Sequence, residues 1–252
     1  MIIDILTLFP EEFYGVINSS IIKRAKEANI VTINIIDYRE YSSKRNKRVD
    51  DYSYGGGAGM IIEVQPIYDA LKAIDPNHQV HRIITSAQGI TFNQAKAQQL
   101  SKYEHLIFIC GHYEGIDSRI DNYIDEKISI GDFILTGGEI ATMAMIDAII
   151  RLLPDALGNN ESSIDESFEN NLLEYPQYTR PPVFDGIEVP EVLLSGDHAK
   201  IDKWRMYMSI KETWEKRKDL LEKAVLTDEQ KKYLEAIKNN ITFEEIIVKK
   251  KK

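Results

Sequence analysis

The sequence predicts an α/β protein with a mainly parallel sheet, followed by a small helical domain. Short apolar runs alternate with helical stretches over residues 1–153, and a helical pattern returns over residues 190–247. Strands that alternate with helices are typical of a parallel sheet covered by helices. The chain has 252 residues, 43% of them hydrophobic, which is enough for one large core or two modest ones.

Each predicted element follows from a local pattern. A strand is expected wherever a short apolar run lies between turn or helix signals, namely at residues 2–8, 31–36, 81–85, 106–110 and 124–130. Pro10 to Glu12 open a helix that we expect to continue through residues 21–28. Further helices are expected at residues 64–74, 93–102 and 139–153. These elements alternate as a parallel sheet requires.

Composition narrows the class of protein. No apolar run approaches the roughly 18 to 20 residues of a membrane span, and the N-terminus lacks the basic start of an export signal, so we expect a cytoplasmic protein and no membrane partner. The single cysteine, Cys110, excludes an internal disulfide and a cysteine-based zinc cluster. It ends an apolar run, which favours a core residue over a nucleophile.

The domain organisation is predicted from a change of texture after Leu153. Residues 154–179 contain several acidic residues but no Lys or Arg, and their apolar residues show no sustained period. We therefore expect a flexible linker. Three segments result: residues 1–153, 154–179 and 180–252. The net charge of −9 argues against a chain that coats nucleic acid non-specifically, but a local basic cluster occupies residues 39–48.

Four glycine-containing segments stand at strand ends or helix starts: residues 54–60, 86–89, 111–115 and 130–138. Ligands of open parallel sheets bind at the carboxyl ends of the strands, where glycine allows close backbone approach, so the four loops indicate one pocket. None has the spacing of an ATP-binding P-loop or of a dinucleotide fingerprint.

Acid–base chemistry by carboxylates remains after the other motifs are excluded. The five histidines have no metal-binding spacing, and no hydrolase nucleophile motif occurs. Asp165 and Glu166 lie in the predicted linker, and Arg151 ends the preceding apolar helix. A carboxylate can remove a proton from a weakly acidic N–H, and a guanidinium can stabilise the resulting charge. The alternative for the two acids is a solvated linker position.

Five strings, in this order and spacing, resemble the bacterial tRNA (guanine-N1)-methyltransferases, the TrmD family. They are VDDYSYGGGAGM at residues 49–60, CGHYEGIDSR at 110–119, SIGDFILTGGE at 129–139, YTRP at 178–181 and VLLSGDHA at 192–199. The resemblance implies a SPOUT-class fold, in which the C-terminal part of the α/β domain forms a deep trefoil knot. It also implies a homodimer with active sites at the subunit interface.

The same resemblance implies the methyl donor S-adenosyl-L-methionine. Its expected binding residues lie in the glycine loops: Thr85, Ser86, Gly89, Gly111, Tyr113, Glu114, Gly115, Ile130, Gly131, Asp132, Phe133, Ile134, Leu135, Gly137 and Gly138. Bulky residues at Gly137 or Gly138 should block such a pocket. Mg²⁺ is expected to take part in catalysis, although no dedicated set of metal ligands can be identified in the sequence.

The target that the resemblance implies is N1 of guanosine at tRNA position 37. The family's catalytic base falls on Glu166 and its arginine on Arg151. The family's usual base is aspartate, so Asp165, after a one-residue slip, stays open as the base. Candidate tRNA contacts are Arg45, Arg48, Asp51, Arg119, Ser195 and His198, with the C-terminal helical domain.

Two alternatives to this activity follow from departures in the sequence. Ala58 and Ala87 replace prolines common in the family's loops, and Glu166 replaces aspartate. The chain could then be a weakened or inactive relative that still binds tRNA. A shared fold does not fix the substrate, so a SPOUT enzyme for another RNA nucleotide is the second alternative. We expect the linker to fold over the guanosine when tRNA binds.

Overall fold

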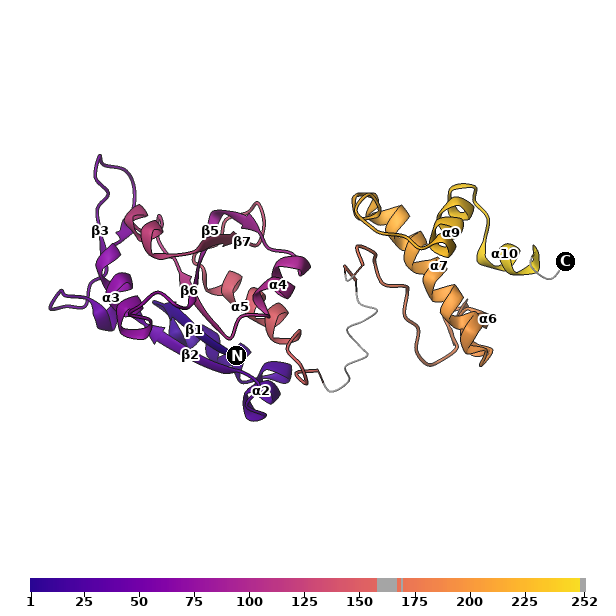
Figure 1. Cartoon of the computed structure of the whole chain (residues 1–252), viewed down its shortest axis with the longest axis horizontal. Coiled ribbons are helices and arrows are strands. Elements are labelled where there is room, and N and C mark those ends of the chain that lie inside the picture. Colours follow the sequence, from indigo (N-terminus) through magenta and orange to yellow (C-terminus); the bar gives the residue numbers. More distant parts are fainter. Residues whose placement is uncertain (158–166, 169, 250–252) are drawn as a thin grey trace. The chain divides into compact units, whose positions relative to one another are not determined.

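The protein divides into two compact units, residues 1–160 and 161–252. A computed structural model describes residues 1–157, 167–168 and 170–249 (Figure 1). In this part of the chain, no helix is long and apolar enough to cross a membrane.

The first unit is built on a five-stranded parallel sheet. Its strands are β1 (Ile2–Thr7), β2 (Thr32–Asp37), β5 (His81–Thr91), β6 (His105–Cys110) and β7 (Glu126–Ser129), in the order β2-β1-β6-β5-β7. Every pairing in this sheet is parallel. The predicted α/β class with a mainly parallel sheet is therefore confirmed. The short β3 (Asp50–Asp51) and β4 (Ile61–Ile62) form a separate antiparallel pair.

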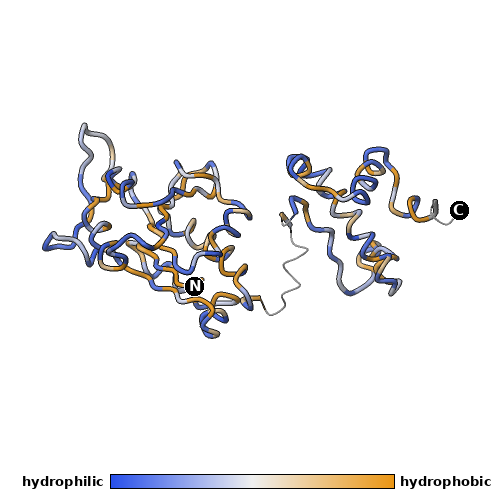
Figure 2. Tube along the Cα trace, in the orientation of Figure 1, coloured by the Kyte–Doolittle hydropathy of each residue, from blue (hydrophilic) through white to orange (hydrophobic). Residues whose placement is uncertain are grey.

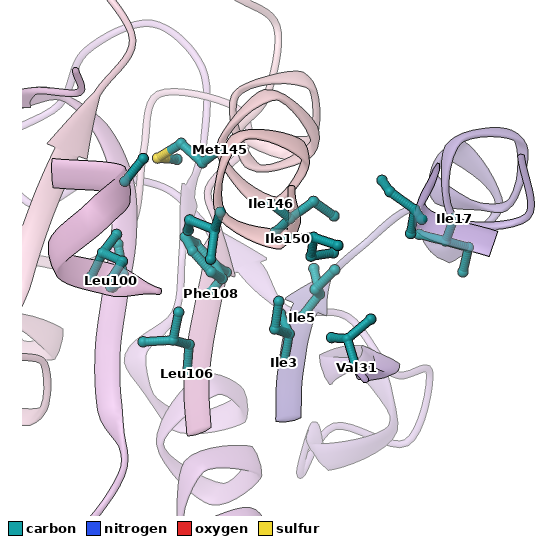
Figure 3. Close-up of a cluster of buried hydrophobic side chains, with 14 of the residues drawn as sticks. Ile3, Ile5, Ile17, Val31, Leu100, Leu106, Phe108, Met145, Ile146 and Ile150 are labelled. Carbon is teal, nitrogen blue, oxygen red and sulfur yellow. The ribbon is translucent and has the colours of Figure 1, made fainter. Parts of the chain in front are cut away.

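One face of the sheet is covered by α2 (Ser20–Glu27), α4 (Gln94–Leu100) and α5 (Glu139–Ile150). Residues two apart in a strand share a face, so Ile3 and Ile5 of β1 point to these helices together with Phe108 of β6. Met145 and Ile146 of α5 complete this core, as Figure 3 shows. The α5 helix is thereby fixed against the centre of the sheet.

The opposite face packs on α3 (Val64–Ile74) and on the short helical turns η2 (Tyr38–Tyr41) and η3 (Ser118–Tyr123). Leu6, Ile107 and Ile109, which alternate with the residues of the first face, are fully buried here against Ile67 and Leu71 of α3. Both faces are covered, which explains why the strands read as nearly continuous apolar runs (Figure 2).

Three predicted elements differ from the structure. The expected helix from Pro10 to Ala28 is interrupted: η1 (Pro10–Phe13) and α1 (Tyr14–Ile17) end before α2 begins at Ser20, whose φ is positive. The strand predicted at residues 81–85 extends to Thr91, past a register shift between Thr85 and Ile90. The helix predicted at residues 139–153 ends at Ile150.

The second unit contains a short hairpin and five helices among its described residues. They are β8 (Val183–Phe184), β9 (Ile187–Glu188), α6 (Glu191–Leu194), α7 (His198–Lys216), α8 (Lys218–Leu221), α9 (Asp228–Lys238) and α10 (Phe243–Lys249). Trp204, Tyr207 and Ile210 of α7 pack against Tyr233 and Ile237 of α9. These side chains form a core that belongs to this unit alone.

Part of the segment expected as a linker contacts α7 of the second unit. The N–H of Leu173 donates to Oγ1 of Thr213 at 2.8 Å, and the hydroxyl of Ser209 donates to the carbonyl of Leu173 at 2.6 Å. The ring of Tyr178 lies 6.3 Å from that of Trp204. Residues 173–178 therefore run along α7.

Candidate functional site

The loops after β5, β6 and β7 line a cavity of about 510 Å³ in the first unit. It lies at the carboxyl ends of parallel strands, where open α/β sheets bind their ligands. Its volume is in the range of small-molecule sites, which is about 300 to 1,000 Å³. The position of the strands thus fixes the position of the candidate site.

Nearly all of the residues expected to bind a cofactor line this cavity. They are Thr85, Ser86, Gly111, Tyr113, Glu114, Gly115, Ile130, Gly131, Phe133, Ile134, Leu135, Gly137 and Gly138. Gly89 and Asp132 are not among the lining residues. Gly89 instead packs on β7, because a Cβ there would lie 2.4 Å from the backbone nitrogen of Ile128. Three of the four predicted glycine loops, 86–89, 111–115 and 130–138, therefore meet in space, whereas no residue of the fourth, 54–60, lines the cavity.

Two of these loops are joined through their backbones. The N–H of Gly138 donates to the carbonyl oxygen of Gly111 at 2.8 Å, and His112 and Gly137 form an antiparallel bridge. A Cβ on Gly138 would lie 2.0 Å from Oγ1 of Thr85 and 3.0 Å from the Cα of Cys110. A side chain at position 138 would therefore separate the loops themselves, which is a stronger constraint than filling the pocket.

A layer of buried polar groups lies behind the joined loops. Glu139 is 2% exposed, and the hydroxyl of Thr7 donates to its Oε1 at 2.8 Å. Burial raises the pKa of the Glu139 carboxyl, while the hydrogen bond from Thr7 opposes that rise. The sulfur of Cys110 lies 3.2 Å from Oγ1 of Thr142. Cys110 is fully buried, as the sequence predicts.

His112 is a cavity residue that the sequence analysis did not select individually. Its ring packs 4.8 Å from the Phe9 ring and 5.0 Å, edge to face, from the Tyr113 ring. Nδ1 is buried and has no hydrogen-bond partner among the described residues. The position of His112 between Gly111 and Tyr113 in a selected loop is the signal that could have identified it.

The rim of the cavity carries exposed apolar side chains. Tyr113 is 46% exposed, Phe133 54% and Ile134 85%, and all three line the cavity. Adjacent exposed apolar groups beside a cavity are typical of a binding surface.

Comparison with known proteins decides the family. The model of the family described as tRNA (Guanine-1)-methyltransferase TrmD matches residues 1–223. The chain belongs to the TrmD family. It is 53% identical over 234 residues to the tRNA (guanine-N(1)-)-methyltransferase of Oceanobacillus iheyensis, covering 92% of this chain and 96% of the relative. It is 57% identical over 232 residues to the Carboxydothermus hydrogenoformans protein of the same name, covering 92% and 91%.

The tRNA contacts that the TrmD resemblance implied lie in both units. In the first unit, Arg48 pairs with Asp50 at 3.1 Å, Asp51 with Lys44 at 3.4 Å and Arg119 with Asp117. In the second unit, Ser195 directly follows α6 and exposed His198 begins α7. Arg45 is exposed and makes no ion pair within the described part of the chain. Most of the expected basic cluster is thus paired with acids.

The catalytic candidates of this TrmD member are placed only in part. Arg151 directly follows α5, and its N–H donates to the carbonyl of Asp147 at 3.2 Å. Asp165 and Glu166 lie outside the described residues. Among the residues that are described, no group of three or more His, Cys, Asp or Glu could hold a metal ion.

Proposed function

We propose that the protein transfers the methyl group of S-adenosyl-L-methionine to N1 of guanosine at position 37 of tRNA. The observation that carries this proposal is the cavity at the joined loops 111–115 and 130–138, in a chain of the TrmD family. The relatives named above carry the same activity in their names. This agreement favours methylation of guanine over the two alternatives, an inactive relative and an enzyme for another nucleotide.

The residues of the cavity fit the methyl donor. Small residues and exposed backbone at Gly111, Gly115 and Gly137 allow a ligand to approach the main chain. Apolar Ile134 and Leu135 offer surfaces for an adenine ring. When bound, S-adenosyl-L-methionine supplies an electrophilic methyl group on a positively charged sulfur. The protein's part is to bind it beside the guanine and to exclude water.

Removal of the N1 proton of guanine requires a base, because that nitrogen is protonated at neutral pH. We assign this role to Glu166, with Asp165 as the second candidate. As the proton leaves, negative charge develops on O6, and the guanidinium of Arg151 would stabilise it. The base of a nucleotide inside an RNA stem or loop must leave its stack to reach such a site.

The knot and the homodimer belong to the same proposal. The hydrogen bond between Gly138 and Gly111 shows that two segments far apart in sequence are in direct contact, as a knotted crossing requires. The exposed side chains of Phe133 and Ile134 would be covered by a second copy of the chain at an interfacial active site. Light scattering at micromolar concentration tests the dimer, and a monomeric mass contradicts it.

The described residues do not form a site for magnesium. The expected requirement is measured by assaying methyl transfer with Mg²⁺ and with a chelator. Contacts to tRNA phosphates are assigned to Arg45, Arg48 and Arg119, and further contacts to the second unit, which includes Ser195 and His198.

The decisive experiment measures methyl transfer from labelled S-adenosyl-L-methionine to unmodified tRNA that carries guanosine at position 37. Nucleoside mass spectrometry should detect N1-methylguanosine. The matched control is the same tRNA with adenosine at position 37, which should remain unlabelled. Binding of both ligands without product would overturn the proposal, and a different methylated nucleoside would favour the alternative target.

A further inference from the structure

Two polar side chains, Glu139 and His112, face each other behind the cavity wall. A Cβ on Gly137 would lie 2.2 Å from Oε2 of Glu139 and 2.7 Å from Nδ1 of His112. The carboxylate and the imidazole ring thus share the space that a side chain at position 137 would fill. Glycine at this position leaves that space open.

The hydrogen bond from Thr7 and the helix dipole favour the ionised form of Glu139, whereas burial opposes it. The Thr7 oxygen accepts from the N–H of Phe9 at 3.0 Å, which leaves the hydroxyl proton free to point at Oε1 of Glu139. Glu139 is also the first residue of α5, where the helix dipole stabilises negative charge. Burial, the largest effect, and the nearby charge of Glu12 outweigh the lowering by Thr7, by the N–H of Glu139 and by His112, so the pKa of the carboxyl is raised.

Two other titratable groups near Glu139, Cys110 and Tyr38, carry no charge that could pair with its carboxylate. Cys110 and Tyr38 both interact electrostatically with Glu139, and burial raises the pKa of each, so both are neutral at pH 7. His112 is therefore the group near Oε2 that can either donate or accept a hydrogen bond there.

His112 combines a buried ring nitrogen with a place in the cavity lining. Nδ1 is buried without a partner among the described residues, while the residue lines the cavity. In a neutral imidazole, one nitrogen donates a hydrogen bond and the other accepts. The partner of Nδ1 therefore decides which of these two properties Nε2 presents to a ligand.

We propose that Glu139 is a positioning residue that keeps the proton of His112 on Nδ1, directly or through one buried water, and so makes Nε2 a hydrogen-bond acceptor in the cavity. An ionised carboxylate only accepts, so the Nδ1–H form satisfies both groups. An acceptor at this wall suits the ammonium group of S-adenosyl-L-methionine. The identity of that ligand rests on the proposed function. The tautomer proposed for His112 is independent of that function.

The test is the tautomer of His112 in the ligand-free protein, read from long-range ¹H–¹⁵N spectra. The chain has five histidines, and His112→Gln assigns the signal of interest. We expect the proton on Nδ1 in the wild type. In Glu139→Gln, the amide can donate to Nδ1, so the proton should move to Nε2. A wild-type ring protonated on Nε2 overturns the proposal without any variant, and so does an unchanged tautomer in Glu139→Gln.

Two control variants isolate the effect. Thr7→Val removes a hydrogen bond to Glu139 but leaves the carboxylate, so the Nδ1–H form should remain. Glu126 pairs with His81 at 2.8 Å on the first residues of β7 and β5, at the opposite end of these strands from the cavity. Glu126→Gln should change the spectrum of His81 and leave that of His112 unchanged.

Steady-state kinetics tests whether the state of His112 affects cofactor binding. Glu139→Gln should raise KM for S-adenosyl-L-methionine about tenfold, as expected for one lost hydrogen bond, with a smaller effect on kcat. Glu126→Gln should leave both unchanged. A protein that shows the expected tautomers but no methyl transfer contradicts the proposed function alone. Unchanged KM in Glu139→Gln overturns the cofactor contact.

Discussion

The N–H of Gly138 donates a hydrogen bond of 2.8 Å to the carbonyl oxygen of Gly111, and this contact joins two of the loops that line the cavity. Gly138 is buried at the start of α5, and Gly111 directly follows β6. Because α5 is fixed against the sheet by its own apolar side chains, the loop before it is held at the strand ends. The core and the site are therefore coupled.

Gly138→Ala should abolish cofactor binding and destabilise the fold. The new methyl group would meet Oγ1 of Thr85 at 2.0 Å and the Cys110 backbone at 3.0 Å. Overpacking of this kind costs about 1 to 3 kcal/mol. Urea unfolding and calorimetric titration with S-adenosyl-L-methionine measure the two effects. Gly15→Ala is the control, since nothing lies within 4 Å of its Cβ position. Unchanged affinity in Gly138→Ala would refute the coupling.

Glu166→Gln should lower kcat for methyl transfer by about 10² to 10⁴, the usual contribution of a general base. Cofactor affinity should remain within about twofold, since the amide has nearly the same size. Asp165→Asn is the comparison that identifies the base, and Glu161→Gln controls for loss of an acid in the same stretch of sequence. Full activity in Glu166→Gln together with loss in Asp165→Asn would transfer the role to Asp165.

Arg151→Ala should lower kcat by about 10² to 10³, the range measured when one group that stabilises a developing oxyanion is removed. Arg151→Lys should recover part of this loss, because it keeps the charge but not the planar fork of donors. Single-turnover assays separate this effect from product release. Arg24→Lys, at an exposed position of α2, is the control and should be fully active. Equal kcat in Arg151→Ala and the wild type would exclude the role.

Local sequence patterns predicted the secondary-structure elements that depend on neighbouring residues of the chain. The parallel strands were predictable because residues such as Ile107 and Phe108 belong to opposite faces that are both buried. The interruption of the predicted helix before Ser20 was not predictable, since a positive φ in a non-glycine residue is imposed by tertiary packing. The end of α5 at Ile150 was likewise missed, because the apolar pattern continues to Leu153.

The candidate site, like the fold, was predictable only where it depends on local sequence patterns. Glycine-rich loops at strand ends predicted a shared cavity, because carboxyl ends of parallel strands lie at one edge of the sheet. The approach of Glu139 and His112 to the same space beside Gly137 was not predictable, because it depends on a crossing of two loops whose geometry no periodicity records. Glu139 directly follows Gly137 and Gly138, and its sequence position is that of an ordinary acidic residue at the start of a helix.

Cys110 should react with a thiol reagent only after unfolding. The side chain is 0% exposed, and burial raises the pKa of its thiol, so both access and thiolate formation are suppressed. Absorbance with Ellman's reagent should show no thiol in native buffer and one per chain in urea. Glutathione in the same native buffer confirms that the reagent is active. Rapid reaction of the native protein would show that the β6 end opens readily.

Asp75→Ala should destabilise the first unit by about 3 to 5 kcal/mol, because it leaves the buried guanidinium of Arg82 without its partner at 2.7 Å. Burial alone would raise the pKa of Asp75, but hydrogen bonds from the N–H of Gln79, from Arg82 and from the N–H of Val80 outweigh it and lower the pKa. A lowered pKa means that this stabilisation is complete above the unfolded value, about 3.9, and is lost as pH falls further.

Urea unfolding at pH 7 and at pH 3 measures this dependence. The wild type should lose more stability between the two values than Asp75→Ala, which no longer has the carboxylate to protonate. Asp219→Ala is the matched control: its exposed pair with Arg217 also lowers the pKa of the acid, but solvent screens it, so stability should hardly change. Equal acid sensitivity of the wild type and Asp75→Ala would show that the buried pair does not govern stability at low pH.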